Sequence, residues 1–322
     1  MRRDLVPTPA LALAGAALVC LLAVPVTARE AGDRTGRGTS TAGEAAAAAA
    51  SGAAAASADT TRADTVADRL RAALEENRHA LALEGGTPTG PGGELLLEEA
   101  ADARYLLVGE THGVAELPGL IAALFRQLKP AGYRHLAVEI GPIQAEKVAE
   151  VLAGPDPMAA YRRFLADHWP GVPFYSWREE AGLLAEAVRV AGEDALWGID
   201  YDILGGRYPL HRLRELAPDS ASRAAAGRLI ARADSLLERA RETGEPSTIL
   251  MFSQPAATWD SLRRRFEPEP GSEADRILDQ LAATARINEA WTAGKRWLSN
   301  RRRVALLKRN LLGYRRRAAP EA

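Results

Sequence analysis

The stretch that decides the fold runs from Arg104 to Pro142 and reads RYLLVGETHGVAELPGLIAALFRQLKPAGYRHLAVEIGP. Twice in it an apolar run leads into a glutamate, first Glu110 and then Glu139, and His112 follows the first of them. A segment of helical periodicity separates the two runs, so the order is strand, helix, strand. The carboxyl ends of neighbouring parallel strands meet at one edge, where α/β proteins bind ligands. The stretch therefore predicts an enzyme or a ligand binder.

The pattern extends in both directions from this stretch. A short helix is expected from Glu94, and a third buried strand over 195–199 ends in Asp200. We expect strands at 105–108 and 135–140, and helices at 116–128, 143–152, 157–168, 177–190, 220–241, 273–297 and 301–316. Residues 247–252 fit either a strand or a helix, because so short an apolar run has no decisive period. The predicted class is α/β, with a parallel-sheet core, flanking helices and a largely helical second half.

The N-terminal part has the composition of an export and linker region. Residues 1–28 combine a basic start, an apolar run and a small-x-small end, which predicts a signal peptide. An uncleaved membrane anchor is the alternative reading of the same run. Residues 29–63, rich in Ala, Gly, Ser and Thr, are expected to form a disordered tether, and 64–84 an amphipathic helix. An exported protein, periplasmic or secreted, is the expected result.

Composition excludes several kinds of chemistry. Cys20 is the single cysteine and lies in the signal-like run, so a mature chain has no disulfide, thiolate nucleophile or cysteine metal site. A formal net charge of -1 gives no general attraction to nucleic acid. Locally, residues 295–317 carry ten basic and no acidic side chains. The helical spacing of Val304, Leu307, Leu311 and Tyr314 favours a solvated basic face, and an anionic partner or membrane surface is the alternative.

Glu110, His112 and Glu139 are the candidate catalytic residues. A carboxylate beside an imidazole orients it and raises its basicity, as a general base requires. The glycines at 109 and 113 allow the backbone to approach a ligand closely. A carboxylate at a buried strand end is costly unless it is paired or acts as a ligand, so Glu139 belongs either to the site or to an arginine ion pair. Together the three residues predict a hydrolytic or metal-binding cleft.

Glu116, Asp200 and Asp202 are the candidate ligand-binding residues. The two aspartates follow the third strand in WGIDYD, and each fits a ligand-binding role or a helix cap. Glu116 begins a helix, where a negative side chain interacts well with the helix dipole. His168 and His211 fit supporting or structural roles. The chain has no GxSxG, HExxH, P-loop or dinucleotide motif, so phosphoryl transfer is not expected.

The motifs LLVGETHG at 106–113, GYRHLAVEIGP at 132–142 and LWGIDYD at 196–202 resemble the superfamily of erythromycin esterases, ChaN-like haem-binding lipoproteins and TraB/Tiki proteins. RRRVALLKRNLLGY at 301–314 extends the similarity, which covers 94–316. The Glu-Thr-His spacing is closer to ChaN-like sequences, since the esterases have one more residue between Glu and His. Members continue into another strand and a histidine-bearing loop, so the domain is expected to lack its C-terminal strand.

The resemblance implies an exported hydrolase in which His112 activates water for attack on an ester or lactone, supported by Glu110 and Glu139. That reading needs no cofactor and takes a small-molecule substrate. The alternative is a ChaN-like binder of haem or a divalent metal, or a Tiki/TraB-like metal-dependent peptidase, with Glu110, His112 and Glu139 as metal ligands. Two carboxylates and a histidine suit a hard or borderline divalent ion. The oligomeric state is left open, and the N-terminus is a possible membrane tether.

Overall fold

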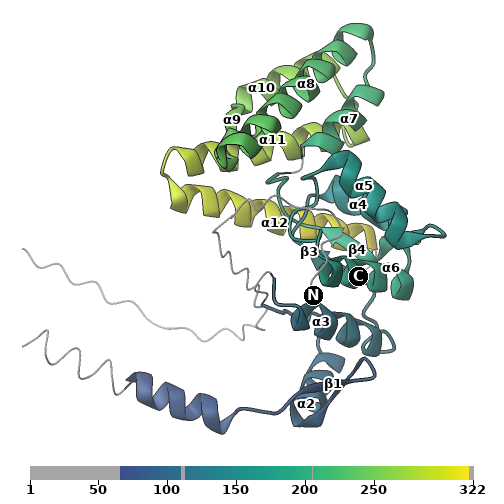
Figure 1. Ribbon diagram of the computed structural model, residues 1–322, viewed down its shortest axis with the longest axis vertical. Coiled ribbons are helices and arrows are strands. Elements are labelled where there is room, and N and C mark those ends of the chain that lie inside the picture. Colours follow the sequence, from purple (N-terminus) through teal and green to yellow (C-terminus); the bar gives the residue numbers. More distant parts are fainter. Residues whose placement is uncertain (1–65, 110–112, 205, 319–322) are drawn as a thin grey trace, which may run out of the picture. The chain divides into compact units, whose positions relative to one another are not determined.

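The computed structural model describes residues 66–109, 113–204 and 206–318, which fall into two compact units (Figure 1). The smaller unit contains the described residues up to Leu107, and the larger one contains the described residues from Val108 onward. The expected signal peptide at 1–28 and tether at 29–63 lie outside the described residues. Within the described ranges, no helix is both long and apolar enough to cross a membrane.

The smaller unit contains a helix and a β-hairpin. Residues 66–76 are helical, β1 (Ala82–Glu84) pairs antiparallel with β2 (Thr87–Thr89), and α2 (Gly90–Ala101) follows. Gly85 and Gly86 have φ angles of 58° and 79°, as a tight two-residue hairpin turn requires. The helix predicted over 64–84 is therefore too long, because its last residues pair as a strand across these glycines.

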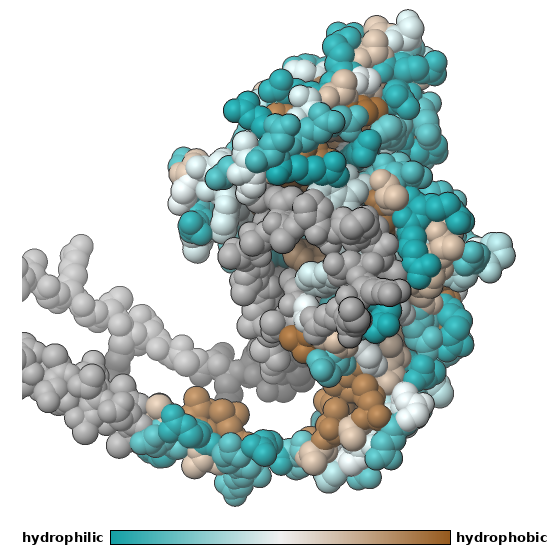
Figure 2. Space-filling model, viewed as in Figure 1, coloured by the Kyte–Doolittle hydropathy of each residue, from teal (hydrophilic) through white to brown (hydrophobic). Residues whose placement is uncertain are grey.

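The larger unit is mostly helical, as predicted for the second half. Its elements are α3 (Glu116–Gln127), β3 (Leu136–Val138), α4 (Pro142–Ala153), α5 (Pro157–His168), α6 (Arg178–Ala191), η1 (Glu193–Ala195), β4 (Leu196–Gly198), α7 (Arg207–Glu215), α8 (Ser220–Thr243), η2 (Pro246–Thr248), α9 (Leu250–Ser253), α10 (Ala256–Phe266), α11 (Glu273–Thr292) and α12 (Arg296–Ala318). In Figure 1, α12 passes from the α8–α11 bundle to the strands. Figure 2 shows mainly hydrophilic residues on the viewed face of that bundle.

The sheet of the larger unit is one parallel pair, in which Leu136 pairs with Leu196 and Val138 with Gly198. Two of the three predicted strands are thus present. The strand predicted over 105–108 is not formed in the described structure. These residues have no strand partner, and Tyr105 and Leu107 are 40% and 43% exposed. A strand needs a neighbour for its backbone hydrogen bonds, and sequence periodicity does not supply one.

Two large apolar cores and a smaller cluster around Leu237, Ala240 and Ile249 stabilise the larger unit. The first lies around β3 and β4 and is built from α3, α4, α5 and α6. The second fills the bundle of α7 to α11, with Trp259 fully buried. At Gly198 an added Cβ would lie 2.5 Å from the Gly141 carbonyl oxygen and 2.6 Å from the Ala145 Cβ. Glycine at that position therefore lets α4 pack directly on β4.

Helix boundaries differ from expectation in the second half. The helix predicted over 273–297 ends at Thr292, and Gly294, with a φ of 72°, separates α11 from α12. The ambiguous residues 247–252 are mostly helical, with Ile249 between η2 and α9. Two helices, α7 and α10, were not predicted.

Candidate functional site

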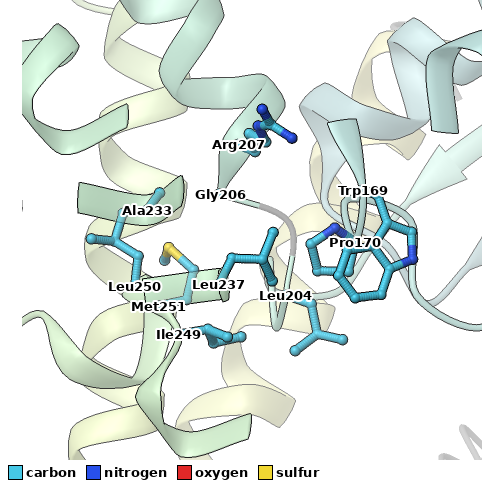
Figure 3. Close-up of a pocket in the computed structure, with 10 residues that line it drawn as sticks. All are labelled: Trp169, Pro170, Leu204, Gly206, Arg207, Ala233, Leu237, Ile249, Leu250 and Met251. Carbon is cyan, nitrogen blue, oxygen red and sulfur yellow. The ribbon is translucent and has the colours of Figure 1, made fainter. Parts of the chain in front are cut away.

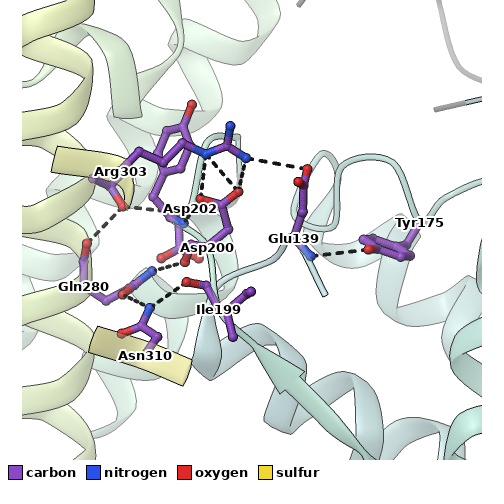
Figure 4. A network of polar contacts seen from close by, with 10 residues as sticks. Glu139, Tyr175, Ile199, Asp200, Asp202, Gln280, Arg303 and Asn310 are labelled. Carbon is purple, nitrogen blue, oxygen red and sulfur yellow. Dashed lines mark hydrogen bonds and ion pairs between the residues drawn. The ribbon is translucent and has the colours of Figure 1, made fainter. Parts of the chain in front are cut away.

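Glu139 and Asp200 meet at the carboxyl edge of the parallel pair, as the strand pattern predicts. Glu139 directly follows β3, and Asp200 stands two residues beyond β4. Between them lies Arg303 of α12, whose Nη2 is 3.5 Å from Glu139 Oε2 and also contacts Asp200 Oδ2 (Figure 4). The two predicted carboxylates and one arginine that was not predicted thus form the centre of the site.

Asp200 is held from several directions. The Arg303 Nε donates to Oδ1 at 3.0 Å and to Oδ2 at 3.1 Å, and the Tyr201 amide donates to Oδ1 at 2.8 Å. Its own amide donates to the Ile140 carbonyl at 3.1 Å, which continues the strand pairing past β4. Burial raises the pKa of Asp200, and the hydrogen bonds from Arg303 oppose that rise. Asp200 is therefore a structural partner of the arginine rather than a helix cap.

Arg303 is the least expected member of the site. Its side chain is 13% exposed, and its guanidinium lies over the Tyr201 ring, 5.4 Å from the centroid. Burial alone would lower the pKa of Arg303, but the bonds to Asp200 raise it above its usual range. The third nitrogen, Nη1, has no hydrogen-bond acceptor among the described residues, so it can donate to a ligand.

Asp202 differs from Asp200 although only one residue separates them. The Gln144 amide donates to its Oδ1 at 3.0 Å, and its backbone amide donates to Thr284 Oγ1 at 3.1 Å. Its Oδ2 is buried without a hydrogen-bond partner among the described residues. Burial raises the pKa of Asp202 to about 7, against an opposing bond from Gln280. Burial therefore favours the protonated form of this carboxyl.

Amides and aromatic rings from α11 and α12 fix the strand ends. Gln280 donates to the Asp200 carbonyl at 2.7 Å, and Asn310 donates to the Ile199 carbonyl at 3.1 Å. Tyr314 stacks on Trp197 of β4 with a centroid distance of 5.4 Å. Arg303, Asn310 and Tyr314 lie seven and four residues apart, so all three project from one face of α12 toward the strand ends.

Glu110 and His112 lie outside the described residues, and the structure neither confirms nor contradicts their roles. The next residue, Gly113, has a φ of 84°, and a Cβ there would lie 3.8 Å from the Trp177 ring. Two residues before Trp177, the Tyr175 hydroxyl accepts the Glu139 amide at 3.3 Å. Gly113 therefore packs on the same loop that contacts Glu139.

The other candidates lie apart from this centre. Glu116 is exposed at the first residue of α3, where the helix dipole accounts for it. His168 and His211 pack together with a ring-centroid distance of 5.8 Å, and burial lowers the pKa of each. Within the part of the chain that the structure describes, no three His, Cys, Asp or Glu side chains are grouped to hold a metal ion.

A pocket lies away from the carboxylate centre, between the Trp169-Pro170 turn and helices α7, α8 and α9 (Figure 3). Its lining is apolar except for Arg207, whose Nε is 3.1 Å from Asp234. The full lining is Trp169, Pro170, Leu204, Gly206, Arg207, Ala233, Leu237, Ile249, Leu250 and Met251. No predicted site residue belongs to it.

Sequence reasoning missed Arg303, Gln280 and Asn310. The expected inward face of α12 included Val304, which is 48% exposed, while Arg303 next to it points inward. The available signal was the heptad spacing of Arg303 and Asn310 around the buried Leu307, since polar residues on an apolar helix face need partners. Comparison of the chain with protein-family models, curated proteins and solved structures finds no match.

Proposed function

We propose that the protein is an exported hydrolase of the erythromycin esterase type, which attacks an ester or lactone with water activated by His112. The observation that supports this most strongly is the convergence of Glu139 and Asp200 on Arg303 at the ends of β3 and β4. A pair of strand-end carboxylates around a buried cation is a prepared polar site, held by at least six hydrogen bonds and ion contacts from three separate segments.

In this proposal Arg303 stabilises the negative charge that develops on the carbonyl oxygen. Its Nη1 is the donor that remains for a substrate, and the bonds to Asp200 hold the guanidinium in a fixed orientation. Donors that are oriented in advance, in a largely buried site, are the usual source of transition-state stabilisation for acyl transfer. Glu139, whose side chain is 22% exposed, faces the same guanidinium and supplies the second carboxylate of the site.

His112 and Glu110 complete the proposed catalytic set. His112 takes a proton from water, and Glu110 orients the imidazole. The described residues support this indirectly. His112 directly precedes Gly113 in the chain, and Gly113 packs on Trp177. The loop of Trp177 also contains Tyr175, whose hydroxyl accepts a hydrogen bond from the Glu139 amide. We further propose that the parallel pair of β3 and β4 is the core of an α/β fold.

The charges at the site favour hydrolysis over metal or haem binding. Arg303 already neutralises Asp200 and lies within 3.5 Å of Glu139, where a bound cation would have to compete with the guanidinium. A metal peptidase or a haem binder would use Glu110, His112 and Glu139 as ligands. Binding of the metal ion or of haem can then be measured directly. That alternative is therefore tested in the same experiment.

The test uses the purified full-length chain on a series of p-nitrophenyl esters and macrocyclic lactones. We expect turnover, and a fall of at least roughly 10²-fold in kcat/KM for His112→Ala, the usual cost of losing a general base. Arg303→Lys should lower kcat more than it raises KM, because lysine keeps the charge but loses the fixed fork of donors. His79→Ala is the matched control, since His79 is an exposed histidine of the smaller unit.

Four results would overturn the proposal. One is activity that survives His112→Ala, and another is an equal loss for His79→Ala. The third is activity that disappears with a chelator and returns with Mn²⁺ or Zn²⁺, which would identify the metal-dependent alternative. A Soret shift on titration with hemin, without turnover, would identify a haem binder.

A further inference from the structure

We propose that the corner between α11 and α12 binds the surface of an anionic phospholipid bilayer. The corner is the turn after Trp291 through Gly294 and the first three turns of α12, and Figure 1 shows it at the end of the α11–α12 hairpin. This surface is separate from the proposed hydrolytic site, although both use α12. It does not depend on the proposed function.

Exposed tryptophans mark the corner. Trp297 is 71% exposed and Trp291 is 49% exposed, whereas Trp259 in the bundle core is fully buried. Val304, two turns after Trp297 on α12, is 48% exposed. Large apolar side chains that gather on an exposed surface mark an interaction site. Tryptophan in particular is favoured at the headgroup level of a bilayer, where its ring is partly buried and its N–H stays hydrated.

The charged side chains of α12 beside Trp297 are all basic. Lys295, Arg296, Arg301 and Lys308 are exposed, and no carboxylate is paired with them among the described residues. From Lys295 to Arg317 the sequence contains no acidic residue. Trp297, Arg301, Val304 and Lys308 recur at helical spacing, so apolar and basic side chains share one stripe of α12. Such a stripe complements phosphate headgroups with acyl chains beneath them.

The ring geometry favours lipid over single-stranded nucleic acid, the other anionic partner that tryptophan and arginine can bind. The Arg296 guanidinium lies over the Trp291 ring at 4.5 Å, and that of Arg301 lies over Trp297 at 5.1 Å. A base would stack on a ring face, and a guanidinium already occupies one of the two faces of each ring. Insertion among lipid headgroups uses the ring edge, and it leaves both guanidinium groups at phosphate height.

The experiment is co-sedimentation of the full-length chain with vesicles of phosphatidylcholine alone or mixed with phosphatidylglycerol. Any binding through the apolar N-terminal run occurs on both kinds of vesicle. The additional binding to vesicles that contain phosphatidylglycerol therefore measures the contribution of the corner. Arg296→Gln with Arg301→Gln should lower that additional binding roughly 25-fold, because each basic side chain near an anionic surface contributes roughly fivefold. Added salt should weaken it further.

Arg228→Gln with Arg232→Gln is the matched control. These two arginines are exposed and four residues apart on α8, and the double substitution removes the same charge. Trp291→Ser with Trp297→Ser should abolish the blue shift of tryptophan emission on anionic vesicles. Circular dichroism should show the same helix content in all variants. Equal binding to both vesicles, an equal loss in the α8 control, or displacement of the vesicles by a single-stranded oligonucleotide would each overturn the proposal.

Discussion

The two faces of α12 use the same residue type in opposite ways. Arg303 faces the strand ends, is largely buried and contacts two carboxylates, while Arg301 is exposed and lies over the Trp297 ring. Both arginines carry the same charge, and they stand two residues apart on one helix. Their surroundings therefore decide whether an arginine organises a polar site inside the protein or presents charge to a partner outside it.

Arg303→Ala should produce the largest change in stability. It leaves Asp200 buried without its cation, and breaking a buried pair on one side costs about 3–5 kcal/mol of unfolding free energy. Urea denaturation followed by circular dichroism measures the loss. Replacing both partners, with Asp200→Asn and Arg303→Met, should recover much of it, since the uncompensated charge is then absent. A double variant no more stable than Arg303→Ala would contradict this account of the pair.

Asp202 should make stability depend on pH. The folded pKa is about 7, and the unfolded value is about 3.9. Since the folded carboxyl holds its proton more tightly, its contribution favours folding below about pH 4 and is lost as the pH rises towards 7. The unfolding free energy should fall by an amount on the order of 4 kcal/mol across that window. Asp202→Asn should remove this fall, and identical pH profiles of the two proteins would contradict it.

Gly141→Ala should have an intermediate effect. The φ of Gly141 is -66°, which alanine adopts freely, but an added Cβ would lie 2.3 Å from Asp202 Oδ1. We expect a loss of about 1–3 kcal/mol from overpacking at a site that cannot relax. In the Asp202→Ala background the same change should cost little, because the clashing oxygens are gone. A thermodynamic cycle of the four proteins measures that coupling.

The smallest effect is expected on the outer face of α12. Arg301→Ala and Trp297→Ser should each change the unfolding free energy by about 0.5 kcal/mol or less, because exposed side chains outside a core contribute little. The same urea titrations measure both variants. A loss for Arg301→Ala as large as that for Arg303→Ala would remove the contrast between the two faces.

Most helices could be predicted because their signals are local. The helix α5 matches its predicted span of 157–168, since Pro157 suits a helix start and apolar residues follow at helical spacing. Strand formation depends on a partner elsewhere in the chain, which is why Tyr105 and Leu107 were expected in a strand and are exposed instead. The Gly85-Gly86 hairpin had a local signal, but the helical pattern before it was given more weight.

Site residues were likewise predictable only where their signal is local in the sequence. Glu139 and Asp200 were found because a carboxylate after a buried strand is informative by itself. Arg303 was not, because its role depends on how α12 is rotated against residues about a hundred positions earlier. A basic helix with mixed apolar residues leaves that rotation open, and Arg303 and Val304 exchanged their expected places. Glu110 and His112 remain predictions from the sequence.

The Trp197 ring offers an optical signal for the state of the site. It lies between His135, with a centroid distance of 4.1 Å, and Tyr314 of α12, at 5.4 Å. Stacking on the His135 and Tyr314 rings sets the surroundings of this indole, so its emission depends on both contacts. Displacement of α12 from the strands would change the same signal, and one fluorophore can therefore report whether Arg303 is seated against its two carboxylates.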